Sequence, residues 1–275
     1  MIVDYHMHLR GPADGREGPI EHTVGAVERF AEAAAARGVD EIGFTEHMYY
    51  FHQLGDLVEH PYQVSRVGHD LDAYCDAVLE GKRRGLPVKL GLELDWLPGR
   101  DAELAELLAP YPWDYLIGSV HVVAGEAVDL APGVWERLSV EEVWSRYFAA
   151  VGELAASGLV DVLAHLDLVK IFGRRPDPGT VAALHEEAAA AVRRAGVAVE
   201  VSTAGLRKPV GELYPASDLL ARCREGGAGA TLGSDAHVAH DVGRDFPVGL
   251  GLLRAAGYET ITVFDARRAR QEPLR

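Results

Sequence analysis

Two histidines near the start of the chain, His6 and His8 in the segment DYHMH, are separated by a single residue. Alternate residues of a strand point to the same face, so both imidazoles could reach one cation. Taken alone, such a pair is equally compatible with ordinary hydrogen-bonded histidines. The pair becomes informative because similar side chains recur further along the sequence.

Metal-capable side chains stand at or just after most of the short apolar runs of the chain. They are His6, His8, Glu46, His47, Glu93, His121, His165, Asp167, Asp235 and His237, with Asp95 as the closest alternative to Glu93. Imidazole and carboxylate without cysteine suit zinc, iron(II) or manganese, and so many ligands exceed the needs of one tetrahedral ion. We therefore predict two or three divalent metal ions, a site that could make hydroxide from water and hydrolyse a phosphoester.

The apolar runs themselves are typical of strands that alternate with Ala-rich helices, the order of a parallel α/β fold. The expected strands cover residues 2–6, 41–45, 88–94, 115–120, 161–166, 198–202 and 230–234. In such folds the carboxyl ends of the strands share one face, so ligands that are distant in sequence would converge there.

The expected helices fill the segments between these strands. They cover residues 24–37, 71–84, 101–108, 140–157, 180–195 and 216–225, and several end before a glycine suited to a left-handed cap, namely Gly38, Gly85, Gly158 and Gly196. The long polar loops 10–22 and 48–70 follow strands and could cover a site.

Composition favours one folded domain over residues 1–275, with 48% hydrophobic and 25% charged residues. The net charge of -15 disfavours nucleic acid as a partner. Cys75 and Cys223 lack metal-like spacing and are expected to be buried free thiols. Without a signal segment or a membrane-length apolar run, we expect a cytoplasmic protein with no membrane partner. We also expect a monomer or homodimer that acts on a small molecule.

In chain order, the segments DYHMH, TEH, GLELDW, SVHV, AHLD and GSDAH resemble the motifs of the polymerase-and-histidinol-phosphatase (PHP) family, over essentially the whole chain. The resemblance implies a distorted seven-stranded (β/α) barrel, similar to a TIM barrel, with a trinuclear metal site at the carboxyl ends of the strands. By position, it assigns His6, His8, Glu93 and Asp235 to a first metal, Glu93, His121 and His165 to a second, and His47 and His237 to a third.

The third metal of many family members also takes a histidine from the loop after the first motif. The corresponding residue here is Asp14 in PADG, which resembles the aspartate of some polymerase-associated members. Glu21 or His22 could take its place, and Asp14 is also a plausible turn residue before Gly15.

The segments STAGLRKPVGELYP, DVGR and AHLDLVKIFG resemble the histidinol-phosphate phosphatase branch of the family. This branch hydrolyses L-histidinol phosphate to L-histidinol and phosphate in histidine biosynthesis. The resemblance implies catalytic roles for Asp235, His237 and Arg207, and phosphate binding by Lys170, Arg207, Lys208 and Arg244. Arg207 ranks first because a guanidinium can bind two phosphate oxygens, although each basic side chain could also simply lie along the barrel rim. Glu46, Asp167 or the aromatic residues 49–51 could contact the amine and imidazole of the substrate.

Three other functions stay open at this point. A PHP nuclease or nucleotide phosphatase would use the same metals, but the negative charge and the STAGLRKP segment argue against it. A catalytically silent metal-binding module would be expected to have lost some ligands. An amidohydrolase of the TIM-barrel type also has an HxH motif and a late aspartate, but usually has eight strands and often a carboxylated lysine.

Overall fold

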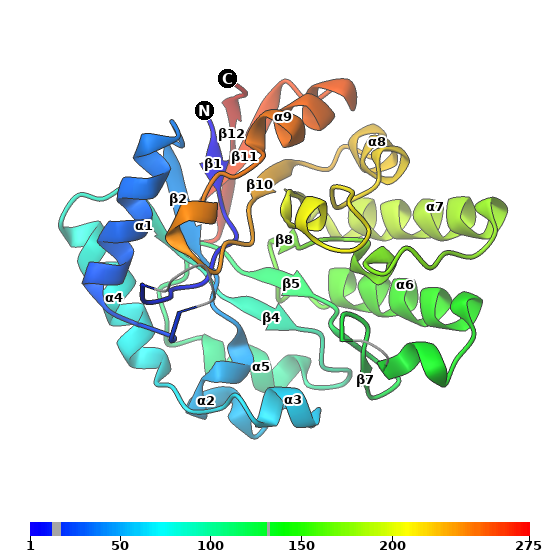
Figure 1. Cartoon of the computed structure of the whole chain (residues 1–275), viewed down its shortest axis with the longest axis horizontal. Coiled ribbons are helices and arrows are strands. Elements are labelled where there is room, and N and C mark those ends of the chain that lie inside the picture. The colour runs from blue at the N-terminus through cyan, green and yellow to red at the C-terminus, as the bar shows by residue number, and fades with distance from the viewer. Residues whose placement is uncertain (13–17, 131–132) are drawn as a thin grey trace.

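The computed structural model describes residues 1–12, 18–130 and 133–275, with parallel strands at the centre and helices around them (Figure 1). One sheet has the order β1-β2-β3, formed by Val3–Asp4, Glu41–Phe44 and Val88–Leu90. The other has the order β10-β9-β8-β5-β4, formed by Ala230–Gly233, Ala198–Ser202, Val162–Leu163, Ile117–Ser119 and Glu93–Asp95. All of these pairings are parallel, which confirms the predicted α/β class.

Backbone contacts join the two sheets at both of their edges. The amide of Tyr5 donates to the carbonyl oxygen of Leu232 at 2.8 Å, just beyond β1 and within β10. At the other edge the amide of Glu93 donates to the carbonyl oxygen of Glu46 at 3.0 Å. Isolated bridges pair Met7 with Ala236 and His47 with Glu93. The segments that carry the predicted ligands therefore lie beside one another where the sheets meet.

Helices surround the strands, and the six predicted ones are present with ends within two residues of those expected. They are α1 Val24–Ala36, α4 Leu71–Arg83, α5 Asp101–Leu108, α6 Val140–Ala156, α7 Pro178–Ala195 and α8 Ser217–Glu225. Side-chain caps explain several starts: Thr23, Asp70, Ser139 and Asp177 each accept a backbone amide of the first turn. The four predicted capping glycines have φ between 69° and 81°.

Other elements were not predicted. Within the expected loop 48–70 lie the 3-10 turn η1 Met48–Tyr50 and the short helices α2 His52–Gly55 and α3 Pro61–Val64. The prediction also missed helix α9 Phe246–Ala255 and two antiparallel hairpins. The hairpins are β6 Val122–Val123 with β7 Glu126–Ala127, and β11 Thr260–Asp265 with β12 Arg268–Pro273. Further 3-10 turns are η2 Gly133–Glu136, η3 Leu168–Lys170, η4 Ala204–Arg207 and η5 Ala239–Asp241.

The predicted strand 88–94 is interrupted between β3 and β4. An added Cβ at Gly91 would lie 2.9 Å from the carbonyl oxygen of Phe44, so the backbones approach too closely there for a larger residue. The hydroxyl of Tyr74 donates to the carbonyl oxygen of Gly91 at 2.8 Å, which satisfies an acceptor inside the core. The interruption lies where the chain passes from one sheet to the other.

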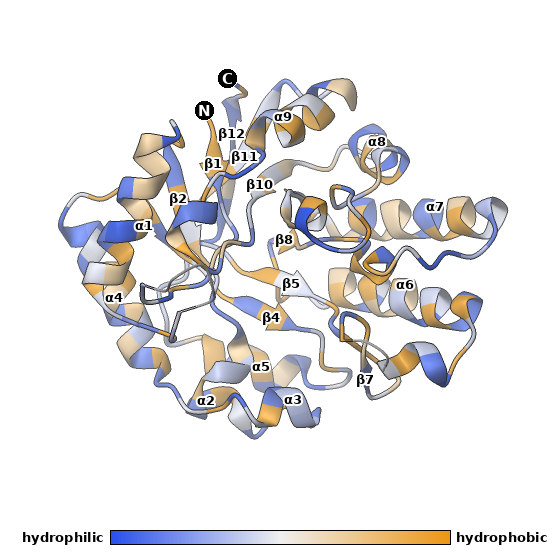
Figure 2. Cartoon of the chain, in the orientation of Figure 1, coloured by the Kyte–Doolittle hydropathy of each residue, from blue (hydrophilic) through white to orange (hydrophobic). Residues whose placement is uncertain are grey.

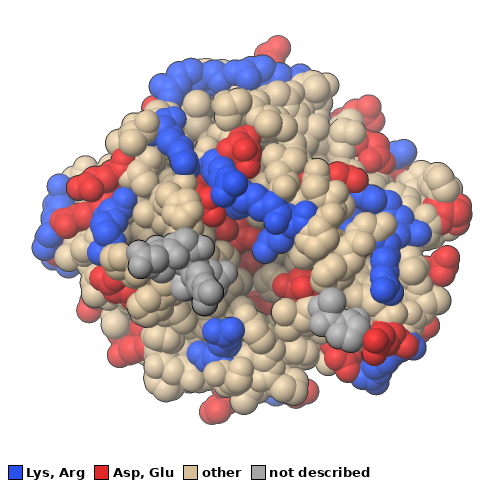
Figure 3. Space-filling view, viewed as in Figure 1, with Lys and Arg blue, Asp and Glu red and all other residues tan. Residues whose placement is uncertain are grey.

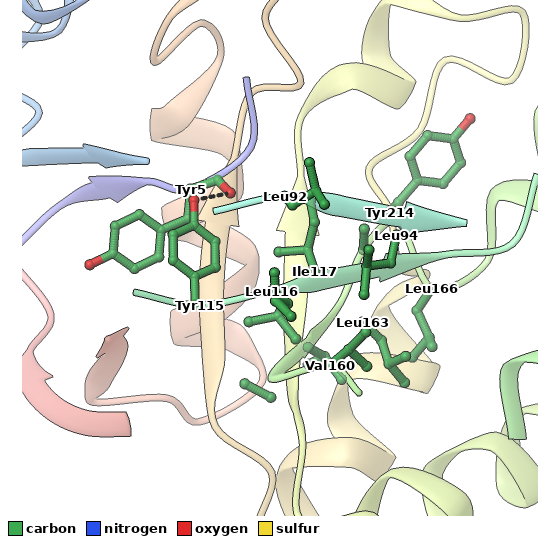
Figure 4. Close-up of a cluster of buried hydrophobic side chains, with 14 of the residues drawn as sticks. Tyr5, Leu92, Leu94, Tyr115, Leu116, Ile117, Val160, Leu163, Leu166 and Tyr214 are labelled. Atoms are coloured by element: carbon green, nitrogen blue, oxygen red, sulfur yellow. Dashed lines mark hydrogen bonds between the residues drawn. The ribbon is translucent and has the colours of Figure 1, made fainter. Parts of the chain in front are cut away.

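Buried hydrophobic side chains form the core, and Figure 4 shows one cluster of them beside the strands. In Figure 2, hydrophobic and hydrophilic residues alternate along the surrounding helices. The rings of Tyr5 and Tyr115 stack with their centroids 4.8 Å apart, and the Tyr115 hydroxyl donates to the Tyr5 carbonyl oxygen at 2.9 Å. Cys75 and Cys223 are buried free cysteines, as predicted. Within the described ranges, no helix has the length and apolar character needed to cross a bilayer.

Candidate metal centre

The residues predicted to hold the first metal converge at the ends of β1, β4 and β10. His6 Nε2 lies 3.6 Å from Glu93 Oε1 and 3.7 Å from Asp235 Oδ1. His8 Nε2 lies 3.3 Å from Asp235 Oδ1 and 3.8 Å from Glu93 Oε2. The two imidazoles reach the same carboxylates because Met7, between them, is buried on the opposite side of the extended chain. Four ligands from three strand ends thus surround one small volume.

The second predicted group shares Glu93 with the first. His165 Nε2 lies 3.3 Å from Glu93 Oε1, and His121 Nε2 lies 3.6 Å from the same oxygen. His165 and Asp235 have positive φ angles, 25° and 51°, which are uncommon for residues other than glycine. Such backbone geometry is concentrated at functional sites, where the surrounding structure holds it in place.

The third group is formed by histidine rings stacked on His8. The ring centroids of His47 and His237 lie 4.2 Å and 4.1 Å from that of His8. Ligand atoms within 4.8 Å of one another define three potential metal groups, namely His8, His47 and His237; His6, His8 and Asp235; and His6, Glu93 and His165. All three groups draw on predicted ligands.

The additional ligands considered for the third metal do not all fall within the described chain. Asp14 lies outside the described residues. Glu21 forms an ion pair with Arg29 at 2.8 Å and accepts a hydrogen bond from Thr23, so its oxygens are engaged away from the histidines. His22 Nε2 lies 3.4 Å from Glu46 Oε2, and Glu46 in turn contacts Nδ1 of His8.

Three buried carboxylates hold the ligand histidines from outside. Glu200 Oε1 lies 2.9 Å from His6 Nδ1, Glu46 Oε1 lies 3.0 Å from His8 Nδ1, and Asp95 Oδ1 lies 2.7 Å from His121 Nδ1. In each case the Nδ1 contact leaves Nε2 directed at the centre, the arrangement typical of histidine that ligates a metal. Glu200 was missed from the sequence, although a glutamate inside the otherwise apolar strand AVEVS is a signal that could have indicated it.

The donor atoms of the centre fit divalent cations. His6 Nε2, His8 Nε2 and Glu93 Oε2 are buried and have no hydrogen-bond partner within the described residues. Buried polar atoms in proteins are normally satisfied. His6 Nε2 lies 3.6 Å from Glu93 Oε1, and His8 Nε2 lies 3.8 Å from Glu93 Oε2, both beyond hydrogen-bond distance. A cation bound between them would satisfy all three.

The histidines of the centre lower the pKa values of its two carboxylates, Glu93 and Asp235, and so favour their charged forms. Burial alone would raise the pKa of Glu93, but the surrounding histidines, led by His47 and His6, outweigh burial and hold it well below its ordinary value. Burial would likewise raise the pKa of Asp235, yet His6 and His8 bring it well below the usual range. For His121, burial would lower the pKa, and Asp95 and Glu93 instead raise it to about 10.

A cavity of about 310 Å³ opens above the ligands, and its wall includes His47, Glu93, His121, His165, Asp235 and His237. Figure 3 shows a band of Lys and Arg side chains that ends beside a hollow near the middle of this face. Of the four basic residues predicted to bind phosphate, Lys208 lines the cavity within the described chain. The centre is therefore accessible to a small molecule from one side.

The other three basic residues are engaged elsewhere. Lys170 is 1% exposed, and its Nζ lies 2.8 Å from Asp167 Oδ2 and donates to the carbonyl oxygen of Leu213 at 2.7 Å. Arg207 donates to the carbonyl oxygen of Ser234 at 2.5 Å. Arg244 pairs with Asp241 at 2.8 Å.

Two predicted substrate contacts are likewise not supported by their surroundings. Glu46 is fully buried and does not line the cavity, because its oxygens accept from His8 and from Arg10 at 2.9 Å. Lys170 is buried, with a partner close in sequence, Asp167, and another 43 residues away, Leu213. Substrate contacts by Glu46 and Lys170 stay predictions.

Comparison with known proteins agrees with this arrangement. The PHP domain family model matches residues 19–204. The chain is 36% identical to a probable histidinol-phosphatase of Deinococcus radiodurans over 266 residues, which are 95% of this chain and 96% of that protein. It is 25% identical to the histidinol-phosphatase of Lactococcus lactis, over 97% and 95% of the two chains.

Solved structures share the fold. The crystal structure of the Lactococcus lactis histidinol phosphate phosphatase, complexed with zinc, L-histidinol and phosphate, aligns with a TM-score of 0.77 and 23% identity over 98% of both chains. A putative histidinol phosphatase of Listeria monocytogenes aligns with a TM-score of 0.74 and 20% identity, over 90% of this chain and 99% of that one.

Proposed function

Because this chain belongs to the PHP family, we propose that it is a histidinol-phosphate phosphatase, a metal-dependent enzyme that hydrolyses L-histidinol phosphate to L-histidinol and phosphate in histidine biosynthesis. The observation that carries the proposal is the convergence of three ligand groups at the floor of one cavity. The near full-length similarity to proteins named as histidinol-phosphatases supports the choice of substrate.

The ligand set suits two or three divalent ions. His6, His8, Glu93 and Asp235 would hold one, Glu93, His121 and His165 a second, and His8, His47 and His237 would contribute to a third. The zinc of the Lactococcus lactis structure favours zinc, and the same ligand types also suit iron and manganese. When bound, the ions would activate water for attack on phosphorus and neutralise charge on the phosphate oxygens.

The protein's own groups set the geometry for this chemistry. Glu200, Glu46 and Asp95 fix the rings of His6, His8 and His121 so that Nε2 of each faces the centre. Glu93 remains ionised because its pKa is held low, and its two oxygens reach different histidines. We therefore expect Glu93 to contribute to the binding of more than one ion.

Lys208 is the basic residue that we assign to the phosphate, because it lines the cavity. Arg207 stays a predicted phosphate ligand and also has a positioning role. Its guanidinium donates to the carbonyl oxygen of Ser234, the residue before Asp235, and so holds the segment that carries Asp235 and His237. Arg244 would act through Asp241, which lies between the two arginines.

We further propose that the two sheets close into a single seven-stranded barrel in one domain over residues 1–275, with β3 and β4 as one interrupted strand. The backbone hydrogen bonds at both sheet edges, from Tyr5 to Leu232 and from Glu93 to Glu46, support closure. The carboxyl ends of all seven strands would then surround the metal centre.

A substrate panel tests the proposed function. Phosphate release by the zinc-, manganese- or iron(II)-loaded protein is measured with L-histidinol phosphate, a nucleoside monophosphate and an aryl phosphate. The proposal predicts a kcat/KM for L-histidinol phosphate at least about 100-fold above the others, the discrimination that a site built to bind substrate polar groups can reach. Equal or greater activity on the nucleotide would overturn the substrate assignment.

A further inference from the structure

The cavity above the metal centre carries more negative charge than its ligands require. Three carboxylates line it within the described residues, namely Glu93, Asp129 and Asp235. Glu93 and Asp235 each belong to a metal group. Asp129 belongs to none of the three metal groups and lies on the segment after β7.

The Asp129 carboxylate has no hydrogen-bond or ion-pair partner among residues 1–12, 18–130 and 133–275. It is half-buried. The Asp129 carboxylate nevertheless acts on the metal centre. Burial lowers the pKa of His121, and Asp129 raises it, although less than Asp95 and Glu93 do. An unpaired, partly desolvated carboxylate beside an accessible cavity is a binding group for a cation.

The carboxylates that the sequence suggested for this task are already engaged. Asp167 accepts from the backbone amide of Ala216 at 2.8 Å and pairs with Lys170 at 2.8 Å, and it does not line the cavity. Glu46 is held by His8 and Arg10. Asp129 is the carboxylate left available among the described residues that line the cavity.

We propose that Asp129 binds the ammonium group of the substrate and so selects a phosphate monoester that carries an amine. The inference rests on the proposed function and deepens it. The phosphate would lie over the metal centre beside Lys208, the ammonium would meet Asp129, and the ring would pack on the apolar wall of Leu168, Ile171 and Phe172. The cavity thus offers opposite charges to the two ends of a substrate that itself carries both.

The test compares L-histidinol phosphate with its deaminated analogue, which keeps the imidazole, the carbon chain and the phosphate but lacks the amine. In Asp129→Asn, kcat/KM for L-histidinol phosphate falls about 10- to 100-fold, the range of one charge-assisted hydrogen bond. The value for the analogue changes less than about threefold. Zinc content and melting temperature stay at wild-type values, because the carboxylate makes no hydrogen bond or ion pair within the described part of the chain.

Product inhibition gives a second readout. Inhibition by L-histidinol weakens in Asp129→Asn, whereas inhibition by inorganic phosphate does not. A purely structural effect on the metal centre would instead weaken both.

Glu59→Gln is the matched control. Glu59 is exposed and lines a neighbouring cavity of about 490 Å³ that shares His60, Gln63 and Val122 with the substrate cavity. We expect this variant to match wild type on both substrates. If Glu59→Gln rather than Asp129→Asn removes the preference for the amine, the ammonium enters the neighbouring cavity and the proposal is wrong.

The remaining outcomes separate the two proposals. Equal losses on both substrates in Asp129→Asn, or no loss on either, overturn the role of Asp129 and leave the phosphatase assignment intact. A wild-type protein that is metal-loaded yet inactive on L-histidinol phosphate overturns both.

Discussion

Glu200 supports the candidate metal centre through His6: Glu200 Oε1 lies 2.9 Å from His6 Nδ1 in the buried interior. The other oxygen of Glu200 accepts from the backbone amide of His165 at 2.7 Å. One carboxylate, outside the set of ligands, therefore fixes a ligand from each of two metal groups.

Replacement of Glu200 by Gln is expected to weaken zinc binding about 10- to 100-fold, the usual cost of losing a group that orients a metal ligand. Competition between the protein and a fluorescent zinc chelator measures the change. Glu186→Gln, which alters an exposed glutamate paired with Arg222, serves as the control and is expected to bind zinc as wild type does. Unchanged affinity in Glu200→Gln would mean that His6 does not need this partner.

Gly233→Ala is expected to disturb the contact between Glu200 and His6, because the added methyl group would collide with both residues. An added Cβ would lie 1.8 Å from Glu200 Oε1 and 2.7 Å from His6 Cβ, so the carboxylate has to move. Zinc content after dialysis should fall, and activity should fall with it. Gly251→Ala in α9, where an added Cβ meets nothing within 4 Å, should retain full zinc content. Normal zinc binding by Gly233→Ala would contradict the packing described here.

Metal binding is expected to release protons. In the metal-free protein, burial lowers the pKa of His121 but Asp95 and Glu93 raise it to about 10, so the imidazole is protonated at neutral pH. A metal displaces that proton, and apparent affinity therefore rises with pH up to about 10. Titration calorimetry in buffers of different ionisation enthalpy measures the number of protons released. A binding enthalpy that is independent of the buffer would contradict this protonation state.

Because the pKa of His121 is raised, its contribution to the free energy of unfolding of the metal-free protein should decrease as pH rises. Its protonated form pairs with Asp95 and Glu93, so the contribution is complete below the unfolded value of about 6.5. It is lost as pH rises towards the folded value of about 10. In His121→Asn this part of the pH dependence of unfolding should be absent, whereas an unchanged profile would assign it to other groups.

Lys208→Ala is expected to lower kcat/KM for L-histidinol phosphate by about 10-fold or more, because a cation beside the phosphate is lost. Zinc content should not change. Arg146→Ala, on the exposed face of α6, provides the comparison for loss of a surface charge. If Lys208→Ala is as active as wild type, the assignment of Lys208 to the phosphate is wrong.

Gly43→Ala tests the packing beneath the site. An added Cβ would lie 2.0 Å from the Tyr115 hydroxyl oxygen, so we expect a loss of about 1–3 kcal/mol in the free energy of unfolding. Tyr115→Phe removes that oxygen and should recover part of the loss in the double variant, although the ring carbon at 2.7 Å remains. Denaturant titrations of the four proteins measure the coupling. Strict additivity of the two changes would mean that they do not meet.

Much of the site could be predicted because its ligands stand at similar positions relative to the predicted strands. His6, His8, Glu93 and Asp235 each follow a short apolar run, and the ends of parallel strands meet whatever the loops do. The family resemblance then sorted these ligands into groups. The helices with a clear cap or a terminal glycine, such as α1 and α7, were found for the same local reason.

What the sequence did not reveal depends on contacts between distant segments. The burial of Lys170 and its hydrogen bond to the carbonyl oxygen of Leu213, 43 residues away, could not be predicted from the local sequence. Helix α9 has the sequence FPVGLGLLRA, whose proline and two glycines weaken the helical pattern, and it forms because its apolar face packs on β9 and β10. Strand β12 is polar and mostly exposed, so it carries no alternating pattern that would predict its pairing with β11.

Metal-dependent hydrolysis of L-histidinol phosphate is tested most directly by a zinc titration of the chelator-stripped protein with phosphate release as the readout. We expect no measurable activity in the stripped protein, and activity that rises with bound zinc until two or three ions per chain are present. Turnover of L-histidinol phosphate that survives complete removal of metal, or a fully loaded protein that fails to release phosphate, would contradict this expectation.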